Sequence, residues 1–295
     1  MNEIIKQLVE AYGPSGHEQE VRALIQHLVA DRADEMRTDA LGNLIVLKKG
    51  AGGGKRVMVA AHMDELGVVV TYVDKKGFLR FATIGGVSPL TLVGSRVRFA
   101  NGTVGVINWE KWLHGDTKPT LEELFIDVGA PAPDKCPVGV GDMACFVRPM
   151  DDLGQRIVAK AMDDRIGCAV AAKALLEMGS SPNDVYFVFT TQEELGTRGA
   201  MVSAFGIEPE VGLAVDVTLT GDTPEGRMLL SLARAGVAVY SPHTAFDNTR
   251  GGINELLARR LGQPAEAARR LRAVLDQTGP AYPALVNLAV ALLGL

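Results

Sequence analysis

Three apolar runs in this chain each stop at residues that carry a carboxylate or an imidazole. The runs and the polar residues that follow them are 56–61 with His62, 185–191 with Glu193 and Glu194, and 213–215 with Asp216. Short apolar runs of this kind predict strands, and the β-branched run 56–61 suits a buried one. Helical patterns at 163–178 and after Arg198 separate them, which predicts a parallel sheet and a fold of the α/β class. In such sheets, functional groups gather at the carboxyl ends of the strands.

The residues at these strand ends predict a metal site. Asp163 and Asp164 open the helix between the first two strands and add to the carboxylates at this edge. So many carboxylates would repel one another unless cations lay between them. A pair of divalent ions with one bridging carboxylate resolves that repulsion, and mixed imidazole and carboxylate ligands suit Zn²⁺, Co²⁺ or Mn²⁺.

Neighbours of these candidate ligands have a supporting or a catalytic role in this interpretation. Asp64, two residues after His62, is suitably placed to hold the imidazole. Asp164 either orients its loop or supports a ligand in the same way. Of the adjacent pair Glu193 and Glu194, one ligates and the other acts as general base on an activated water.

The segment from 68 to 152 has a different pattern of apolar and polar residues. It consists of short alternating apolar runs, such as 69–73, 96–99 and 104–107, separated by Gly, Asn and Asp turns. This spacing predicts a small β-rich domain inserted into a larger one. The main domain then comprises residues 1–67 and 153–225.

Two helices are expected before the first strand. Residues 2–11 have apolar positions at helical spacing, and the residues from Gly13 to Gly16 break that pattern. A second helix is expected to start at Ser15, because Glu18 three residues later completes the sequence of a capping box.

Composition narrows the classes of partner. The 295 residues carry 30 Lys and Arg against 35 Asp and Glu, a net charge of −5 without a basic block, which argues against nucleic acid. The longest apolar stretch, 284–295, is shorter than the roughly 20 residues that span a bilayer. Three cysteines without C-x-x-C spacing, and a charged N-terminal segment, are typical of the cytoplasm rather than of export. We therefore expect a cytoplasmic protein that binds neither nucleic acid nor membranes.

Four motifs in this order resemble one known family. They are Ala61-His62-Met63-Asp64-Glu65, Met162-Asp163-Asp164-Arg165-Ile166-Gly167, Thr190-Thr191-Gln192-Glu193-Glu194-Leu195-Gly196 and Ala214-Val215-Asp216-Val217-Thr218. Together they resemble the cytosolic dinuclear-metal aminopeptidases of the glutamyl-aminopeptidase type, which include large tetrahedral assemblies. The resemblance covers residues 1 to about 225. It implies a three-layer α/β/α metallopeptidase domain, peptide substrates and a homo-oligomer.

The resemblance also implies a role for each site residue. His62 and Asp216 bind one metal ion, Asp163 bridges two ions, and Glu194 binds the second. Glu193 is then the general base that takes a proton from the metal-activated water and passes it to the leaving amine. The product is a free amino acid and a shortened peptide.

The family pattern stops after about residue 225. The family carries a further histidine ligand in an Arg-Tyr-x-His-Ser-Pro type segment, and this sequence has no such segment. The expected substitutes are His243, a water, or a residue of another chain. The catalytic domain is therefore expected to be incomplete at its C-terminal end, and a catalytically silent metal-binding or interaction protein derived from a truncated peptidase is the alternative to an active enzyme.

The remaining residues resemble two other families. The segment 226–262, with His243 and Asp247, resembles a fragment of the GTP-cyclohydrolase-like dinuclear-metal family. The segment 263–295 resembles one tetratricopeptide unit, and a single unit does not bury its own face. We expect a helical C-terminal tail.

Overall fold

A five-stranded mixed sheet carries the strand ends that the sequence singled out. The computed structural model describes residues 1–111, 118–154 and 156–217. In these residues the sheet has the order β1-β2-β12-β3-β13, with β1 Glu35–Thr38, β2 Leu44–Lys48, β3 Arg56–His62, β12 Asp184–Thr190 and β13 Val211–Ala214. β3 pairs in parallel with β12 and β13, as predicted. β2 pairs antiparallel with β1 and β12, so the sheet is mixed rather than purely parallel.

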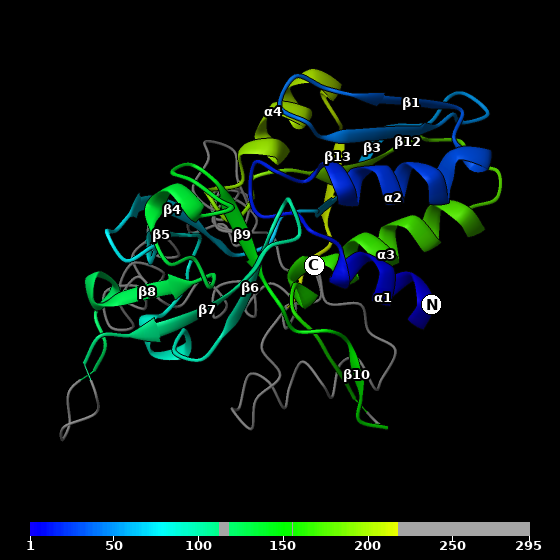
Figure 1. Cartoon of the computed structure of the whole chain (residues 1–295). Coiled ribbons are helices and arrows are strands. Elements are labelled where there is room, and N and C mark those ends of the chain that lie inside the picture. Colours follow the sequence, from blue (N-terminus) through cyan, green and yellow to red (C-terminus); the bar gives the residue numbers. More distant parts are fainter. Residues whose placement is uncertain (112–117, 155, 218–295) are drawn as a thin grey trace, which may run out of the picture. The chain divides into compact units, whose positions relative to one another are not determined.

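Helices cover both faces of this sheet. Helices α1 (Asn2–Glu10), α2 (Gln19–Val29) and α3 (Met162–Glu177) lie on one face and α4 (Arg198–Ile207) on the other (Figure 1). Side chains alternate along a strand, so Val46 on β2 and Phe187 on β12 join the core under the first three helices, whereas Val188 contacts the core under α4. The described residues thus have the α/β/α layering that was expected.

Helix α2 starts later than the sequence pattern indicated. We expected it to begin at Ser15 with a capping box to Glu18, and this was wrong, because α2 begins at Gln19 and its N-cap makes no side-chain hydrogen bond. The Ser15 hydroxyl and the Glu18 carboxylate bond to other segments of the chain instead. The capping-box sequence therefore serves the loop before the helix rather than the helix itself.

The β-rich segment forms a closed six-stranded barrel. Its strands are β4 Gly67–Val73, β5 Leu79–Ile84, β6 Arg96–Phe99, β7 Val104–Trp109, β8 Leu124–Asp127 and β9 Met143–Phe146, in the closed order β4-β5-β8-β7-β6-β9. Its interior is filled by apolar side chains such as Leu79, Phe99 and Ile107, so it has a packed core rather than a channel. The short strands β10 (Asp151–Asp152) and β11 (Ile157–Val158) follow it. The bounds 68–152 for a separate domain stay a prediction.

The end of α1 contacts the barrel directly. The Tyr12 hydroxyl donates to the Met143 carbonyl at 2.9 Å, and the Glu10 carboxylate accepts from the Met150 amide at 3.0 Å. Arg98 on β6 donates to the Glu10 carbonyl at 3.2 Å. These bonds join the end of α1 to β6, to β9 and to the residues that follow β9.

Several expectations fall outside the described residues. They concern His243, the segment 226–262 and the helical tail 263–295. Among the helices that the structure does describe, none combines the length and the apolar character needed to cross a membrane.

Candidate active site

The polar residues at the strand ends converge as the parallel register requires. His62 is the last residue of β3, pairs with Thr190 of β12 and is 3% exposed. The chain after β12 carries Glu193 and Glu194, and Asp216 follows β13 on the other side of β3. Because all three strands run in the same direction, these side chains share one edge of the sheet.

Two groups of possible metal ligands share the His62 imidazole. Ligand atoms of His62, Asp163 and Glu194 lie within 4.8 Å of one another, and so do those of His62, Asp164 and Asp216. The structure therefore brings together all four ligands expected from the described residues. It also adds Asp164, which we had expected only in a supporting role.

Each of the two ring nitrogen atoms of His62 faces at least one carboxylate. Nε2 is 3.0 Å from Asp163 Oδ1 and 3.8 Å from Glu193 Oε2, while Nδ1 is 3.4 Å from Asp64 Oδ1. Burial disfavours the charged imidazolium, but the hydrogen bonds to Asp163 and Asp64 outweigh burial and raise the pKa of His62 to about 11. The site therefore strongly favours a positive charge at this position.

Two carboxylates of the site resist ionisation. Burial, with a contribution from the negative charge of Asp216, raises the pKa of Asp164 to about 8 against the opposing effect of His62. Burial likewise raises the pKa of Glu194 to about 7, with contributions from Asp163 and from Asp64. Burial is the larger cause of both shifts, and the repulsion that was expected from the sequence adds to it; a bound cation would favour the ionised forms.

Asp64 connects the imidazole to the loop after β12. Its fully buried carboxylate accepts hydrogen bonds from the Glu193 amide at 2.9 Å and the Glu194 amide at 3.1 Å. Burial alone would raise the pKa of Asp64, but hydrogen bonds from His62, Ser15 and the Glu193 amide hold it below its ordinary value. The carboxylate is therefore charged at neutral pH and fixes the backbone of both glutamates.

Asp164 supports the first turn of α3. Asp163 and Asp164 have non-helical backbone angles, so the regular helix begins after them. The Asp164 carboxylate accepts from the Gly167 amide at 3.1 Å, as an N-cap residue does, and from the His62 amide at 3.2 Å. It therefore ties the start of α3 to the end of β3.

A buried ion cluster lies next to these residues in the sequence. Lys160 donates to both carboxylate oxygens of Glu65, at 2.6 and 2.8 Å, and Arg165 lies 3.4 Å from the same carboxylate. Arg165 is fully buried and also donates to the Leu8 carbonyl at 2.6 Å and the Gly13 carbonyl at 3.2 Å. The cluster anchors the residues after His62 and after Asp163 to the N-terminal helix.

The barrel also reaches the site. Gly85, in the loop after β5, has a φ of +75°, and a Cβ atom there would lie 3.3 Å from Glu194 Oε2 and would clash with Leu66. A residue without a side chain thus allows the barrel loop to approach the Glu194 carboxylate.

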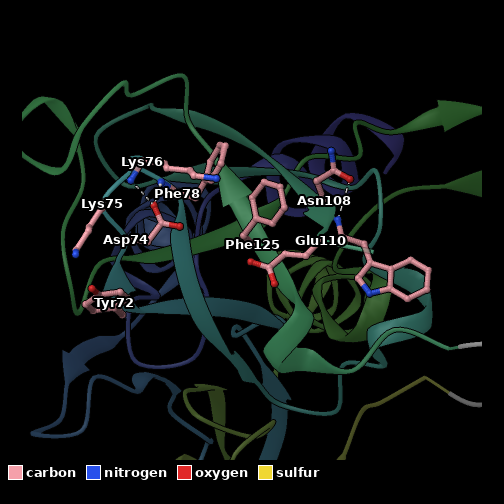
Figure 2. A pocket seen from close by; sticks show the side chains of 9 residues that line it. Tyr72, Asp74, Lys75, Lys76, Phe78, Asn108, Glu110 and Phe125 are labelled. Carbon is pink, nitrogen blue, oxygen red and sulfur yellow. Dashed lines mark hydrogen bonds between the residues drawn. The ribbon is translucent and has the colours of Figure 1, made fainter. Parts of the chain in front are cut away.

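A cavity of about 700 Å³ lies elsewhere, on the barrel, and is drawn in Figure 2. Its lining includes Tyr72, Lys75, Phe78, Asn108 and Phe125, and it includes none of the candidate ligands. The Asp74 carboxylate at its edge accepts from the amides of Lys76 and Phe78, at 2.8 and 3.0 Å, and so holds the turn between β4 and β5.

Sequence reasoning missed two residues beside the site. Ser15 and Glu18 bond to Asp64 and to the Gln192 amide, and we had interpreted both as helix caps. Their signal in the sequence was the one that we assigned to a helix start. His243 lies outside the described residues, so its role as a ligand stays a prediction.

Comparison with known families gives a match over most of the chain. The model of the family described as M42 glutamyl aminopeptidase matches residues 42–265, which extends beyond residue 225, where we expected the resemblance to end. A protein of Acetivibrio thermocellus, provisionally named an aminopeptidase, is 46% identical over 241 residues that cover 81% of this chain and 72% of the relative. A shorter match, 42% identical over 45 residues, is to a GTP cyclohydrolase 1 type 2 homolog of Clostridium perfringens and covers 15% of this chain and 17% of that protein.

Solved structures agree with this match. An aminopeptidase of the archaeon Desulfurococcus kamchatkensis is 37% identical with a TM-score of 0.72, over 79% of this chain and 76% of that chain. The TET1 peptidase of Pyrococcus horikoshii, described as able to assemble into a tetrahedron or a large octahedral shell, is 28% identical with a TM-score of 0.67, over 80% of this chain and 82% of that chain. The homologues are thus named as peptidases, and their folds have the same mixed α/β architecture.

Proposed function

This chain belongs to the M42 glutamyl aminopeptidase family, and from that premise we propose that it is a metal-dependent aminopeptidase, a hydrolase that removes N-terminal residues from peptides. The observation that carries the proposal is the pair of ligand groups that share His62 at the carboxyl ends of β3, β12 and β13. Each group brings one imidazole and two carboxylates within 4.8 Å of one another, which is close enough for the three to share one ion.

The donors of the site suit divalent ions. One imidazole and several carboxylates form the mixed nitrogen and oxygen set that Zn²⁺, Co²⁺ and Mn²⁺ accept. The raised pKa values of Asp164 and Glu194 point the same way, because burial and neighbouring negative charge disfavour their ionised forms until a cation is added. We propose two ions, held by His62, Asp163, Glu194 and Asp216, with His243 as a further ligand.

The ions would act as Lewis acids on the scissile carbonyl and would acidify the attacking water. Glu193 takes the proton of that water on its carboxylate as the water oxygen bonds to the carbonyl carbon. It then delivers the proton to the amine nitrogen as the peptide C–N bond breaks. Asp64 supports this step because its carboxylate accepts a hydrogen bond from the Glu193 amide at 2.9 Å, which limits the movement of the base.

Hydrolysis of amino-acid p-nitroanilides tests the proposal. The chain, stripped with a chelator and supplied with Zn²⁺, Co²⁺ or Mn²⁺, is expected to release p-nitroaniline, and Glu193→Gln is expected to lower kcat by about 10²- to 10⁴-fold. Glu177→Gln, at an exposed position on α3, is the matched control and is expected to leave kcat unchanged.

Metal analysis accompanies this assay. Two ions per chain with turnover agree with the proposal, and His243→Ala lowers the metal content if His243 ligates. Bound ions without release of p-nitroaniline above the Glu193→Gln level would instead identify a catalytically silent metal-binding protein.

We further propose a homo-oligomer located in the cytoplasm. The named assemblies of the Pyrococcus horikoshii relative support the first part. The free thiols of Cys136, Cys145 and Cys168 support the second, because reducing compartments keep thiols unpaired. Light scattering of the purified chain and fractionation of cells that express it would check the two parts separately.

A further inference from the structure

The loop that links α1 to α2, residues 13–18, runs beside the residues that follow His62. Pro14 forms an isolated parallel bridge with Glu65. The Glu65 amide donates to the Gly13 carbonyl at 3.1 Å, and the Ser15 amide donates to the Glu65 carbonyl at 3.3 Å. Around Pro14, this 13–18 loop is therefore hydrogen-bonded to the segment that carries Asp64.

The side chain of Ser15 points from this loop to Asp64. Its hydroxyl donates to Asp64 Oδ2 at 2.6 Å, and the two residues are 3% and 0% exposed. The same oxygen accepts the Glu194 amide, and Oδ1 accepts the Glu193 amide. Ser15 thus fixes the position of the Asp64 carboxylate, which in turn binds the backbone amides of Glu193 and Glu194.

The side chain of Glu18 bonds to the loop after β12 from the other end of the 13–18 loop. Its Oε1 accepts the Gly16 amide at 2.6 Å and the Gln192 amide at 3.2 Å, and Glu18 is 2% exposed. Gln192 has a φ of +54°, in the left-handed region that residues other than glycine rarely adopt. The hydrogen bond from its amide to Glu18 therefore stabilises an unfavourable turn immediately before Glu193.

Neither side chain serves helix α2, because the N-cap of that helix makes no side-chain hydrogen bond. We propose that Ser15 and Glu18 are positioning residues of the site, which act through Asp64 and Gln192 on the placement of His62, Glu193 and Glu194. Their effect on catalysis rests on the proposed function, whereas their effect on the order of the loop after β12 does not. They touch neither the substrate nor the reacting atoms.

Backbone amide hydrogen exchange in the chelated full chain tests the effect on loop order. Ser15→Ala and Glu18→Ala are expected to speed exchange in peptides that cover residues 190–197 by about tenfold or more, since each removes a hydrogen bond that involves a carboxylate. Ser203→Ala and Glu20→Gln are the matched controls. The Ser203 hydroxyl is buried in α4 and has no hydrogen-bond partner among the described residues. Glu20 is exposed in the first turn of α2.

Metal affinity and steady-state kinetics test the effect on the site. Both alanine variants are expected to weaken Co²⁺ binding by about 10- to 100-fold, as the loss of residues that orient ligands does elsewhere. With saturating metal, kcat falls by a similar factor while KM stays within about twofold, because the variants misplace the base and do not remove substrate contacts. Glu18→Gln keeps an acceptor oxygen and is expected to recover most of both losses.

The outcomes separate this inference from the proposed function. If the wild-type chain hydrolyses no p-nitroanilide, the proposed function fails, and exchange and Co²⁺ affinity still decide whether the two residues position the site. Wild-type exchange at 190–197 in both alanine variants overturns the inference. An increase spread evenly over the whole chain overturns it as well, since that indicates global destabilisation.

Discussion

At the scale of single residues, His62 is defined by the carboxylates around it. Asp64 faces one ring nitrogen, and Asp163 and Glu193 face the other, so the imidazole is the positive centre of a negative cluster. The pKa of Glu194, raised to about 7, belongs to the same cluster. Proton binding and metal binding at this site are therefore in competition.

The stability of the metal-free protein is expected to fall as pH rises from 5 to 8. Glu194, with a pKa raised from 4.5 to about 7, holds a proton in the folded state that the unfolded chain has released. Its stabilising contribution is present below pH 4.5 and is lost as pH rises through 7, and Asp164 acts in the same direction between 3.8 and about 8. The contribution of His62 is present below pH 6.5 and is lost toward 11, so it adds to the same trend.

Thermal unfolding in a chelating buffer at pH 5, 6, 7 and 8 measures this trend. Added Mn²⁺ or Zn²⁺ is expected to raise Tm more at pH 8 than at pH 5, because the ligands are then free of protons. A Tm of the chelated protein that is constant or rises between pH 5 and 8 would contradict the assignment of these shifts.

At the scale of elements, the sequence predicted those strands whose signal lies within a few consecutive residues. The runs that became β3 and β12 were found because an apolar strand stops at a polar residue within the same few positions. β1 was missed, because Met36 is the only apolar residue among its four and it lacks the alternation of a half-buried strand. Ser15 and Glu18 were misassigned because their partners lie 49 and 174 residues away, and no local pattern encodes such a partner.

The loop after β5 gives a prediction at this scale. Gly85→Ala is expected to lower stability by about 1–2 kcal/mol, because its φ of +75° disfavours a side chain. It is also expected to lower kcat, because the new methyl group crowds Leu66 and the Glu194 carboxylate. Gly102→Ala is the matched control, since Gly102 has a φ of +86° in the same barrel with open space where the methyl would lie. An equal loss of kcat in both variants would show that strain alone, and not contact with Glu194, explains the effect.

At the scale of the whole described chain, the cluster of Lys160, Glu65 and Arg165 joins elements that are far apart in sequence. Glu65 follows β3, Lys160 precedes α3, and Arg165 donates to carbonyls at the end of α1 and in the 13–18 loop. Breaking a buried pair on one side leaves an uncompensated charge, which is costly.

Glu65→Gln is therefore expected to lower the free energy of unfolding by about 3–5 kcal/mol, measured by urea denaturation. Glu177→Gln breaks the exposed pair between Lys173 and Glu177 on α3 and is expected to change it by less than about 0.5 kcal/mol. If the two substitutions changed the free energy of unfolding by similar amounts, burial would not explain how much the Glu65 cluster contributes to stability.

The closed barrel also bears on the order of folding. His62 and Asp163 are 101 residues apart, and all six strands of the barrel lie in the sequence between them. Its first and last strands pair with each other, with Gly67 opposite Cys145, so closing the barrel brings the two connecting segments together. We expect the entropy of joining this long loop to be lost as the barrel closes, before the site residues meet. The pairing of its first and last strands thus holds together the two segments that carry His62 and Asp163. We therefore expect the site to assemble late in folding, after β4 and β9 have paired.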